Sequence, residues 1–328
     1  MKPFTYTAPT TLDEALTSLE RGEEPRLLAG GTDLLGTARR GIETPDHLIN
    51  LKSIPELTGI HQTPDNGLTI GAIPRLSDVA ENQLVVENYP ILVQAIAQTA
   101  TPQIRNTGTI GGNLCQRPRC WYYRHPDFPC VRKRGEGCFA VGGRNRYHAI
   151  FGGHGCFIVH PSDTAPALIA LGARVEIIGP GGSRELPLSD FFVGPEENLT
   201  GETALAPNEI LTRIHLPPPA SGSTGLYLKA SERRATDFAL VSVAVVLARQ
   251  DAQITHARVV LSGVAPIPWR LPKVEEILLE RGTSAESIQQ TCDTAVEGAH
   301  TMSQNAYKLT LLKGLLKKAL CQLSPRDS

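Results

Sequence analysis

Residues 26–35, RLLAGGTDLL, place an apolar run directly before two adjacent glycines. The run predicts a short β-strand, and the glycines predict a loop whose backbone N–H groups can approach a pyrophosphate closely and form an anion-binding nest. Thr32 adds a hydroxyl donor. The pattern is not G-x-G-x-x-G, so a Rossmann fold is unsupported. Considered alone, the stretch fits a helix C-cap or a hairpin turn at least as well.

Two later segments carry related signals. TGTIGGN (107–113) is a second glycine loop, for which an ordinary turn is the alternative. HPSD (160–163) places Asp163 at the start of a predicted helix, where an N-cap is the alternative. Each signal is weak in isolation, and the order of the three along the chain is what becomes specific.

Helices and strands alternate outward from these loops, without an internal repeat. We expect helices over 11–21 (capped by Thr10 or Thr11), after the proline in 87–100, near 162–172, and at about 271–281, 284–299 and 304–321. Strands are expected at 26–28, 47–51, 68–72, 156–160, 173–179, 225–233, 239–249 and 256–264. Residues 101–115 are turn-rich, and 217–225 is the clearest linker. We therefore predict three parts: 1–53, 54–218 and 219–328, α+β throughout.

The bulk composition restricts the class of protein. The chain has 328 residues, 41% apolar and 20% charged, with a formal net charge of −1. This balance argues against a general nucleic-acid or membrane-surface binder. No apolar run is long enough to span a bilayer, and no apolar h-region follows Met1, so a cytoplasmic location is expected from this sequence.

Five of the seven cysteines fall within 42 residues, in a segment rich in Gly, Pro and Arg. Cys120, Cys130, Cys138 and Cys156 have wide, irregular spacing, whereas structural zinc usually uses C-x2–4-C pairs. A four-thiolate cubane, a zinc site, and a basic loop with unrelated thiols or disulfides all remain open on spacing alone. The segment also carries cations that can offset an anionic cluster: Arg117, Arg119, Arg124, Arg132, Lys133, Arg134, Arg144 and Arg146.

The remaining cysteines suggest other roles. Cys115 directly follows GGNL, so we expect it near a cofactor rather than as a metal ligand. Cys292 and Cys321 lie in helical patterns and are expected to be inert thiols.

In its motifs the chain resembles the FAD-binding (medium) subunits of the molybdenum hydroxylases, the group that includes xanthine dehydrogenase and carbon monoxide dehydrogenase. The matching segments occur in the family's order: AGGTDLL (29–35), TIGA (69–72), TIGGN (109–113), PSDTAPAL (161–168), FFVGP (191–195) and EILTRIHLP (209–217). YLKASERRATDFALVSVAVVL resembles the family's C-terminal domain. The resemblance implies a two-part, PCMH-type FAD-binding domain and a smaller C-terminal α+β domain with a three-stranded sheet and helices.

The insert over about 116–156 is similar to that of the bacterial aldehyde oxidoreductase branch, in which an extra [4Fe–4S] cluster is bound. This resemblance implies that Cys120, Cys130, Cys138 and Cys156 are the cluster ligands. It also implies a set of FAD contacts: Arg26, Leu27, Leu28, Ala29, Gly30, Gly31, Thr32, Asp33, Leu34, Thr109, Gly111, Gly112, Asn113, Cys115, Ser162, Asp163, Ile210, Leu211 and Lys229.

Some positions carry more specific expectations. Lys229 resembles a lysine close to the isoalloxazine, with a solvated strand lysine as the alternative, and its replacement is expected to affect the flavin more than folding. Arg233 and Arg234 are interpreted as surface charges or subunit contacts. Tyr122 and Tyr123 either cover the cluster or pack the loop. No catalytic side chain is assigned to this chain.

The family further implies a three-chain assembly in which a small subunit carries two [2Fe–2S] clusters and a large subunit holds the molybdenum cofactor. Electrons from aldehyde oxidation would reach FAD here and leave to an unidentified acceptor. Co-export to the periplasm on a partner's twin-arginine signal is the alternative to the cytoplasm. Three other functions stay open: a hydroxybenzoyl-CoA reductase-like subunit, a stand-alone flavin oxidase, and a zinc-stabilised module without flavin.

Overall fold

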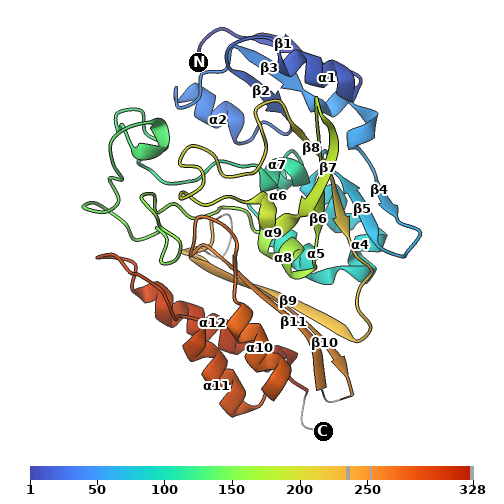
Figure 1. Cartoon of the computed structure of the whole chain (residues 1–328), viewed down its shortest axis with the longest axis vertical. Helices are drawn as coiled ribbons and strands as arrows, with labels where there is room; N and C mark the ends of the chain where they lie inside the picture. Colours follow the sequence, from blue (N-terminus) through green and yellow to red (C-terminus); the bar gives the residue numbers. More distant parts are fainter. Residues whose placement is uncertain (234–236, 252, 326–328) are drawn as a thin grey trace.

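The computed structural model describes residues 1–233, 237–251 and 253–325. Figure 1 shows three parts stacked along the long axis, each built around its own sheet, with the N-terminal part at one end and the C-terminal part at the other. The sheets fall within 1–53, 54–218 and 219–328 respectively. The expected α+β architecture is confirmed, while the boundaries between the parts stay predictions.

The N-terminal sheet is parallel, in the order β1-β3-β2. Its strands are β1 (Thr5–Thr7), β2 (Pro25–Leu28) and β3 (His47–Asn50), its helices are α1 (Leu12–Leu19) and α2 (Leu34–Arg39), and 3₁₀ turns lie at Leu51–Ser53 and Pro55–Leu57. Parallel strands of one sheet need crossover connections; α2 lies on the crossover between the neighbours β2 and β3, and α1 on the connection from β1 to β2, which lie on either side of β3. The predicted cap of α1 is confirmed at Thr11, whose hydroxyl accepts from the Glu14 N–H at 3.2 Å.

The middle sheet is antiparallel, in the order β4-β5-β8-β6-β7. Its strands are β4 (Ile60–Gln62), β5 (Leu68–Gly71), β6 (Arg174–Gly179), β7 (Gly182–Pro187) and β8 (Ile210–Leu216). The accompanying helices are α3 (Leu76–Glu81), α4 (Gln83–Asn88), α5 (Pro90–Ala97), α6 (Pro102–Arg105), α7 (Ile110–Leu114), α8 (Thr164–Ala170) and α9 (Leu188–Phe191). Alternate residues of β6 and β8 enter the main hydrophobic core, so the opposite face of the sheet carries polar side chains.

The C-terminal sheet corrects one expectation, because its order in the described residues is β12-β11-β10-β9, with four strands rather than three. The strands are β9 (Ser223–Ala230), β10 (Val241–Gln250), β11 (Gln253–Ser262) and β12 (Trp269–Arg270), and the helices are α10 (Pro272–Arg281), α11 (Ala285–Thr294) and α12 (Tyr307–Leu323). A two-residue strand such as β12 is too short to produce a period-2 pattern. The three predicted helices are confirmed.

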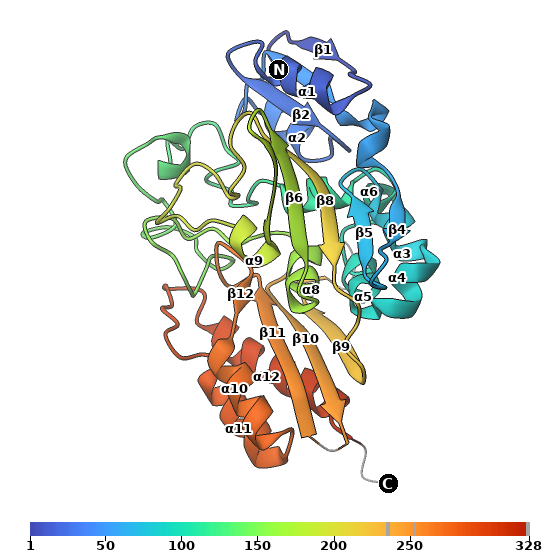
Figure 2. The same cartoon turned by 45° about the vertical axis from the view of Figure 1, so that its right-hand side comes forward.

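The C-terminal sheet is covered on both faces. Helices α10 and α12 pack on one side, while α5 and α8 of the middle part pack on the other. Figure 2 shows the helices α10–α12 gathered on the outer side. Strand β10 is buried from Val241 to Ala248 for this reason, and its sequence is a nearly continuous apolar run rather than an alternating one.

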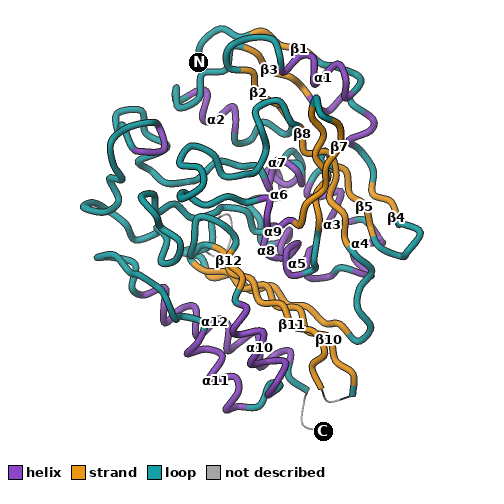
Figure 3. The backbone as a smooth tube through the Cα atoms, in the orientation of Figure 1, coloured by secondary structure: helices purple, strands orange, loops and turns teal. Residues whose placement is uncertain are grey.

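Residues 116–156 form the long loop on the left of Figure 3, with a single described 3₁₀ turn at Val131–Lys133. The expected lack of regular structure in this insert is confirmed. The strand expected at 156–160 is wrong: the Phe157 carbonyl accepts from Ala149 N and the His160 N–H bonds Ala265 O, so the segment bonds two separate partners instead of one ladder. Residues 101–115 contain the short helices α6 and α7 where only turns were expected.

Candidate functional site

The two glycine loops meet backbone to backbone. Strand β2 ends at Leu28, and a Cβ placed on Gly30 would overlap the carbonyl oxygen of Thr107 in the second loop. Gly31 has φ +72°, in the left-handed region that favours glycine. Thr32 is exposed, and its hydroxyl would lie 3.8 Å from a Cβ placed on Gly108 of the second loop. Both glycines of the first loop are therefore required by the fold itself.

The second loop leads into the short helix α7. Thr109 caps this helix, accepting from the Gly112 N–H at 3.1 Å, and a Cβ on Gly111 would come within 2.8 Å of Ala72 on the end of β5. The carboxamide oxygen of Asn113 accepts from the hydroxyls of Ser162 (2.6 Å) and Thr164 (2.7 Å). Two predicted FAD contacts, Asn113 and Ser162, thus join the second loop to the start of α8.

Asp163 makes a buried ion pair rather than an N-cap. Its carboxylate accepts from Lys229 Nζ and from the Tyr227 hydroxyl, both at 2.7 Å, and it makes no capping bond to α8. The Asp163 and Lys229 side chains are only 5% and 4% exposed, so the alternative of a solvated lysine is wrong. Burial raises the pKa of the Asp163 carboxyl, against the opposing effect of the neighbouring ammonium. Lys229 also donates to the Gln98 carbonyl at 2.8 Å.

A cavity of about 630 Å³ opens where the two loops meet, lined by Gly30, Thr107 and Thr109 among others. Two cations at this cavity were not anticipated from the sequence, Lys52 and Arg75. Lys52 donates to the carbonyl of Ala29 at 2.9 Å, and burial lowers its pKa. Isolated cations outside a motif give no sequence signal, so only the three-dimensional structure identifies them as candidate phosphate ligands.

The other predicted FAD contacts divide between loop positions and core positions. Ala29, Gly112 and Leu34 lie at or beside the facing loops. Leu27 and Leu28 are half-buried in β2, and the Arg26 guanidinium pairs with Glu24 at 2.8 Å. Ile210 and Leu211 begin β8 and enter two different hydrophobic cores, that of the N-terminal part and that of the middle part. Cys115 packs against the middle core, where burial raises its thiol pKa to about 12 and makes it unreactive at neutral pH.

Asp33 connects the first glycine loop to the insert. Its carboxylate accepts from the backbone N–H of Arg117 at 2.7 Å and lies 2.7 and 2.8 Å from the guanidinium nitrogens of Arg119 and Arg124. Asp33 was predicted only as a residue of the FAD loop. The structure shows instead that its side chain faces the cysteine insert, so the two predicted cofactor regions are directly bonded to each other.

A second buried carboxylate fastens the far side of the insert. Glu202, 5% exposed, lies 2.5 Å from Arg117 Nη1 and 3.2 Å from Arg132 Nη2. Arg132 also donates to the Leu199 carbonyl at 2.6 Å. These arginines were predicted to balance cluster charge; here protein carboxylates and carbonyls pair with them, while the Nε of Arg132 is buried without a hydrogen-bond partner. Burial raises the pKa of the Cys156 thiol, and the nearby guanidinium of Arg132 acts in the opposite direction.

In the folded insert, the four predicted ligand cysteines lie near enough to influence one another's pKa. None is in a disulfide; Cys130 and Cys156 are buried and Cys120 and Cys138 half-buried. Burial raises the pKa of Cys120 to about 12, with neighbouring Cys138 and Cys156 adding to the effect. No three of the four sulfurs lie within 4.8 Å of one another. No three of them are therefore at the spacing of sulfurs on one tetrahedral zinc ion, about 3.8 Å.

The aromatic and basic residues of the insert have mainly packing roles. The Tyr123 hydroxyl accepts from Arg117 Nε at 2.9 Å, and the Tyr122 hydroxyl accepts from the Arg144 N–H at 2.6 Å. The His148 ring lies 3.3 Å from the Cys120 sulfur. Arg233 is exposed and pairs with Asp237, whereas Arg234 lies outside the described residues.

Comparisons with known proteins agree with this geometry. Residues 2–219 match a family described as "FAD binding domain in molybdopterin dehydrogenase", and residues 226–323 match "CO dehydrogenase flavoprotein C-terminal domain". The chain therefore belongs to the family of FAD-binding subunits of molybdenum hydroxylases. Its class is that of an oxidoreductase flavin subunit, as the resemblance in the sequence predicted.

Whole-length relatives support this assignment. The aldehyde oxidoreductase FAD-binding subunit PaoB of Escherichia coli is 38% identical, over 98% of each chain. The carbon monoxide dehydrogenase medium chain of Hydrogenophaga pseudoflava is 31% identical, over 97% of this chain and 96% of the relative. A solved structure of the carbon monoxide dehydrogenase of that organism superposes with a TM-score of 0.78 at 28% identity, covering 98% and 96% of the two chains. Within the described residues, no helix has the length and apolar character needed to cross a bilayer.

Proposed function

We propose that this chain is the electron-transfer flavin subunit of a molybdenum-containing aldehyde oxidoreductase, and that it binds a [4Fe–4S] cluster beside FAD. The observation that carries the proposal is the bonding of Asp33 to Arg119 and Arg124, because it joins the first glycine loop to the cysteine insert. The aldehyde substrate class is taken from the 38% identical PaoB, whose name includes aldehyde oxidoreductase.

The facing loops supply the groups that would bind FAD. The backbone N–H groups around Gly30 and Gly31 suit a pyrophosphate, and Lys52 adds a cation to the cavity that Gly30 also lines. Lys229, fixed by Asp163, would stand near the flavin ring. Bound flavin accepts one or two electrons and so can collect them singly and release them in pairs. The protein's part is to bind and orient it.

The insert would bind the cluster through Cys120, Cys130, Cys138 and Cys156. None of the four is in a disulfide, and no three of their sulfurs lie within 4.8 Å of one another, which favours a cubane over one zinc ion as the proposed group. Arg132 would face the cluster near Cys156. The proposed partners are a small subunit with two [2Fe–2S] clusters and a large subunit with the molybdenum cofactor, in keeping with relatives that are called a subunit or a medium chain.

Anaerobic purification of the complex tests the cofactors. We expect yellow flavin bands, acid-labile sulfide and four more iron atoms than two [2Fe–2S] clusters supply. Cys130→Ser should remove much of that extra iron, while Cys321→Ser, at an exposed cysteine, should leave it unchanged. Equal iron and sulfide in both variants would remove Cys130 from the ligand set, and their absence from the wild type would end the cluster proposal.

Turnover tests the role in a complex. The three-subunit complex should oxidise aldehydes and reduce its flavin anaerobically, and the isolated chain should do neither. Aldehyde turnover by the isolated chain would instead indicate a stand-alone flavin oxidase.

A further inference from the structure

The polar face of the middle sheet gathers three side chains that commonly bind metals. Glu176 on β6 pairs directly across strands with Glu185 on β7, and β8 on the other side of β6 carries His215 opposite Arg174. Like charges directly opposite each other in an antiparallel pair repel. These strands turn their apolar residues into the core, so the three side chains project from a rigid framework away from it.

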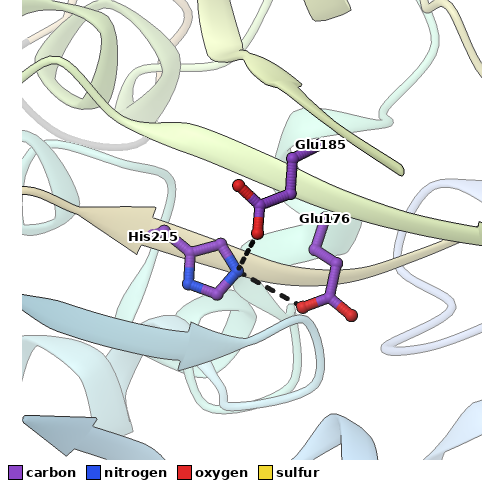
Figure 4. A group of neighbouring side chains, drawn as sticks. All are labelled: Glu176, Glu185 and His215. Carbon is purple, nitrogen blue, oxygen red and sulfur yellow. Dashed lines mark hydrogen bonds and ion pairs between the residues drawn. The ribbon is translucent and has the colours of Figure 1, made fainter. Parts of the chain in front are cut away.

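Both carboxylates turn an oxygen toward the same imidazole nitrogen. His215 Nε2 lies 3.3 Å from Glu176 Oε2 and 3.9 Å from Glu185 Oε1, and Figure 4 shows the two carboxylates converging on that nitrogen. The second oxygen of each carboxylate faces an arginine. Arg213 Nη1 donates to Glu176 Oε1 at 2.8 Å and also to its Oε2 at 3.0 Å, Ser183 donates to Oε1 at 3.2 Å, and Arg174 lies 3.5 Å from Glu185 Oε2.

The other nitrogen of His215 is held by a hydroxyl. Thr69 on β5 is the direct cross-strand partner of His215, and its Oγ1 lies 3.0 Å from Nδ1. When Nδ1 donates its proton to this hydroxyl, the lone pair of Nε2 faces the two carboxylate oxygens. A histidine that ligates a metal is usually oriented by such a bond on its other nitrogen.

We propose that Glu176, Glu185 and His215 bind a divalent transition-metal ion, with zinc as the ion that fits. Ligand atoms on tetrahedral zinc lie about 3.4 Å apart; the three ligand atoms here lie within 4.8 Å of one another, and His215 and Glu176 are already at the required spacing. Glu185 is half exposed, and its other oxygen pairs with Arg174, which is also half exposed. Water completes the coordination in such three-ligand sites.

Local charge selects for zinc over hard cations. Arg213 and Arg174 offset the two carboxylates, so a cation is not attracted by charge alone. Magnesium and calcium bind through oxygen ligands and gain little from an imidazole, whereas zinc forms a strong bond to it. A bound ion would cross-link β7, β6 and β8. This inference does not depend on the flavin or the cluster.

The test uses the intact chain in its complex, stripped with a mild chelator, dialysed against Zn²⁺ and assayed for zinc per chain. The site variants are Glu185→Gln, and His215→Gln as a second probe. The matched controls are Glu280→Gln, at an exposed helix position, and His61→Gln, at an exposed histidine of β4 in the same sheet. The cysteines are identical in all variants, so zinc bound by thiols cancels in the comparison.

We expect the site variants to bind one zinc fewer than the wild type and the controls. Zinc should raise the melting temperature of the wild type and the controls, magnesium should not, and both site variants should lose the zinc effect. Thr69→Val should weaken zinc binding at least tenfold. Equal zinc content and equal zinc-induced shifts in the wild type, Glu185→Gln and His215→Gln would overturn the proposal, as would an equal response to magnesium.

Discussion

The substitution Lys229→Met tests how much the buried ion pair between Lys229 on β9 and Asp163 at the start of α8 contributes to stability. Methionine keeps the length and the apolar stem of lysine but removes the ammonium group. Asp163 would then retain only the Tyr227 hydroxyl, at 2.7 Å, inside a site where its side chain is 5% exposed. The Gln98 carbonyl would also lose a donor.

Removing one member of a buried pair leaves an uncompensated charge and typically costs about 3–5 kcal/mol. We therefore expect Lys229→Met to lower the free energy of unfolding by about that amount. The sequence alone predicted that a substitution here would affect the flavin more than folding; the buried pair predicts a folding effect as well. The double variant Asp163→Asn with Lys229→Met should recover part of the loss, because it removes the buried charge and keeps an acceptor for Tyr227.

Urea unfolding of the flavin-loaded chain, followed by circular dichroism, measures both variants. Lys273→Met is the matched control, since Lys273 is 75% exposed and pairs with Glu297 at 3.2 Å; its loss should be below about 1 kcal/mol. A loss for Lys229→Met no larger than that of the control would refute the reasoning. So would a double variant that is less stable than the single one.

The remaining predictions concern a buried lysine and the two loops. Burial lowers the pKa of Lys308 from 10.5 to about 7. Between these two pH values the unfolded chain therefore binds more protons than the folded chain. The free energy of unfolding of the wild type, relative to Lys308→Met, should rise as the pH is raised from about 7 to about 10.5. Urea unfolding at several pH values measures this difference. Gly30→Ala should lower the free energy of unfolding by about 1–3 kcal/mol, because the added Cβ would push the two loops apart. It should also weaken FAD binding, measured by fluorescence titration. Gly36 has open space around it, so Gly36→Ala should be neutral or slightly stabilising. Asp33→Asn weakens the bond to Arg124 and should destabilise the folded insert by about 1.5–3 kcal/mol. Tryptic cleavage within the insert should then become faster, and unchanged cleavage would contradict this.

Local patterns along the chain were sufficient to predict the strand before the first glycine loop, helix α1 with its Thr11 cap, and the long helices of the C-terminal part. They failed where tertiary contacts replace local propensity. The segment at 156–160 has the composition of a strand but no single neighbouring strand to pair with, and β12 is too short to leave a pattern.

The sequence predicted the class of this protein through the resemblance of its motifs, in their order, to a known family, whereas each glycine loop or cysteine taken alone left several functions open. Only the tertiary structure decided the partners of the charged side chains: Asp33 with the insert, Asp163 with Lys229, and His215 with two glutamates from neighbouring strands. Those pairings join residues up to 91 positions apart. An ion pair depends on distance in space and on burial, neither of which is encoded in the spacing of residues along the chain.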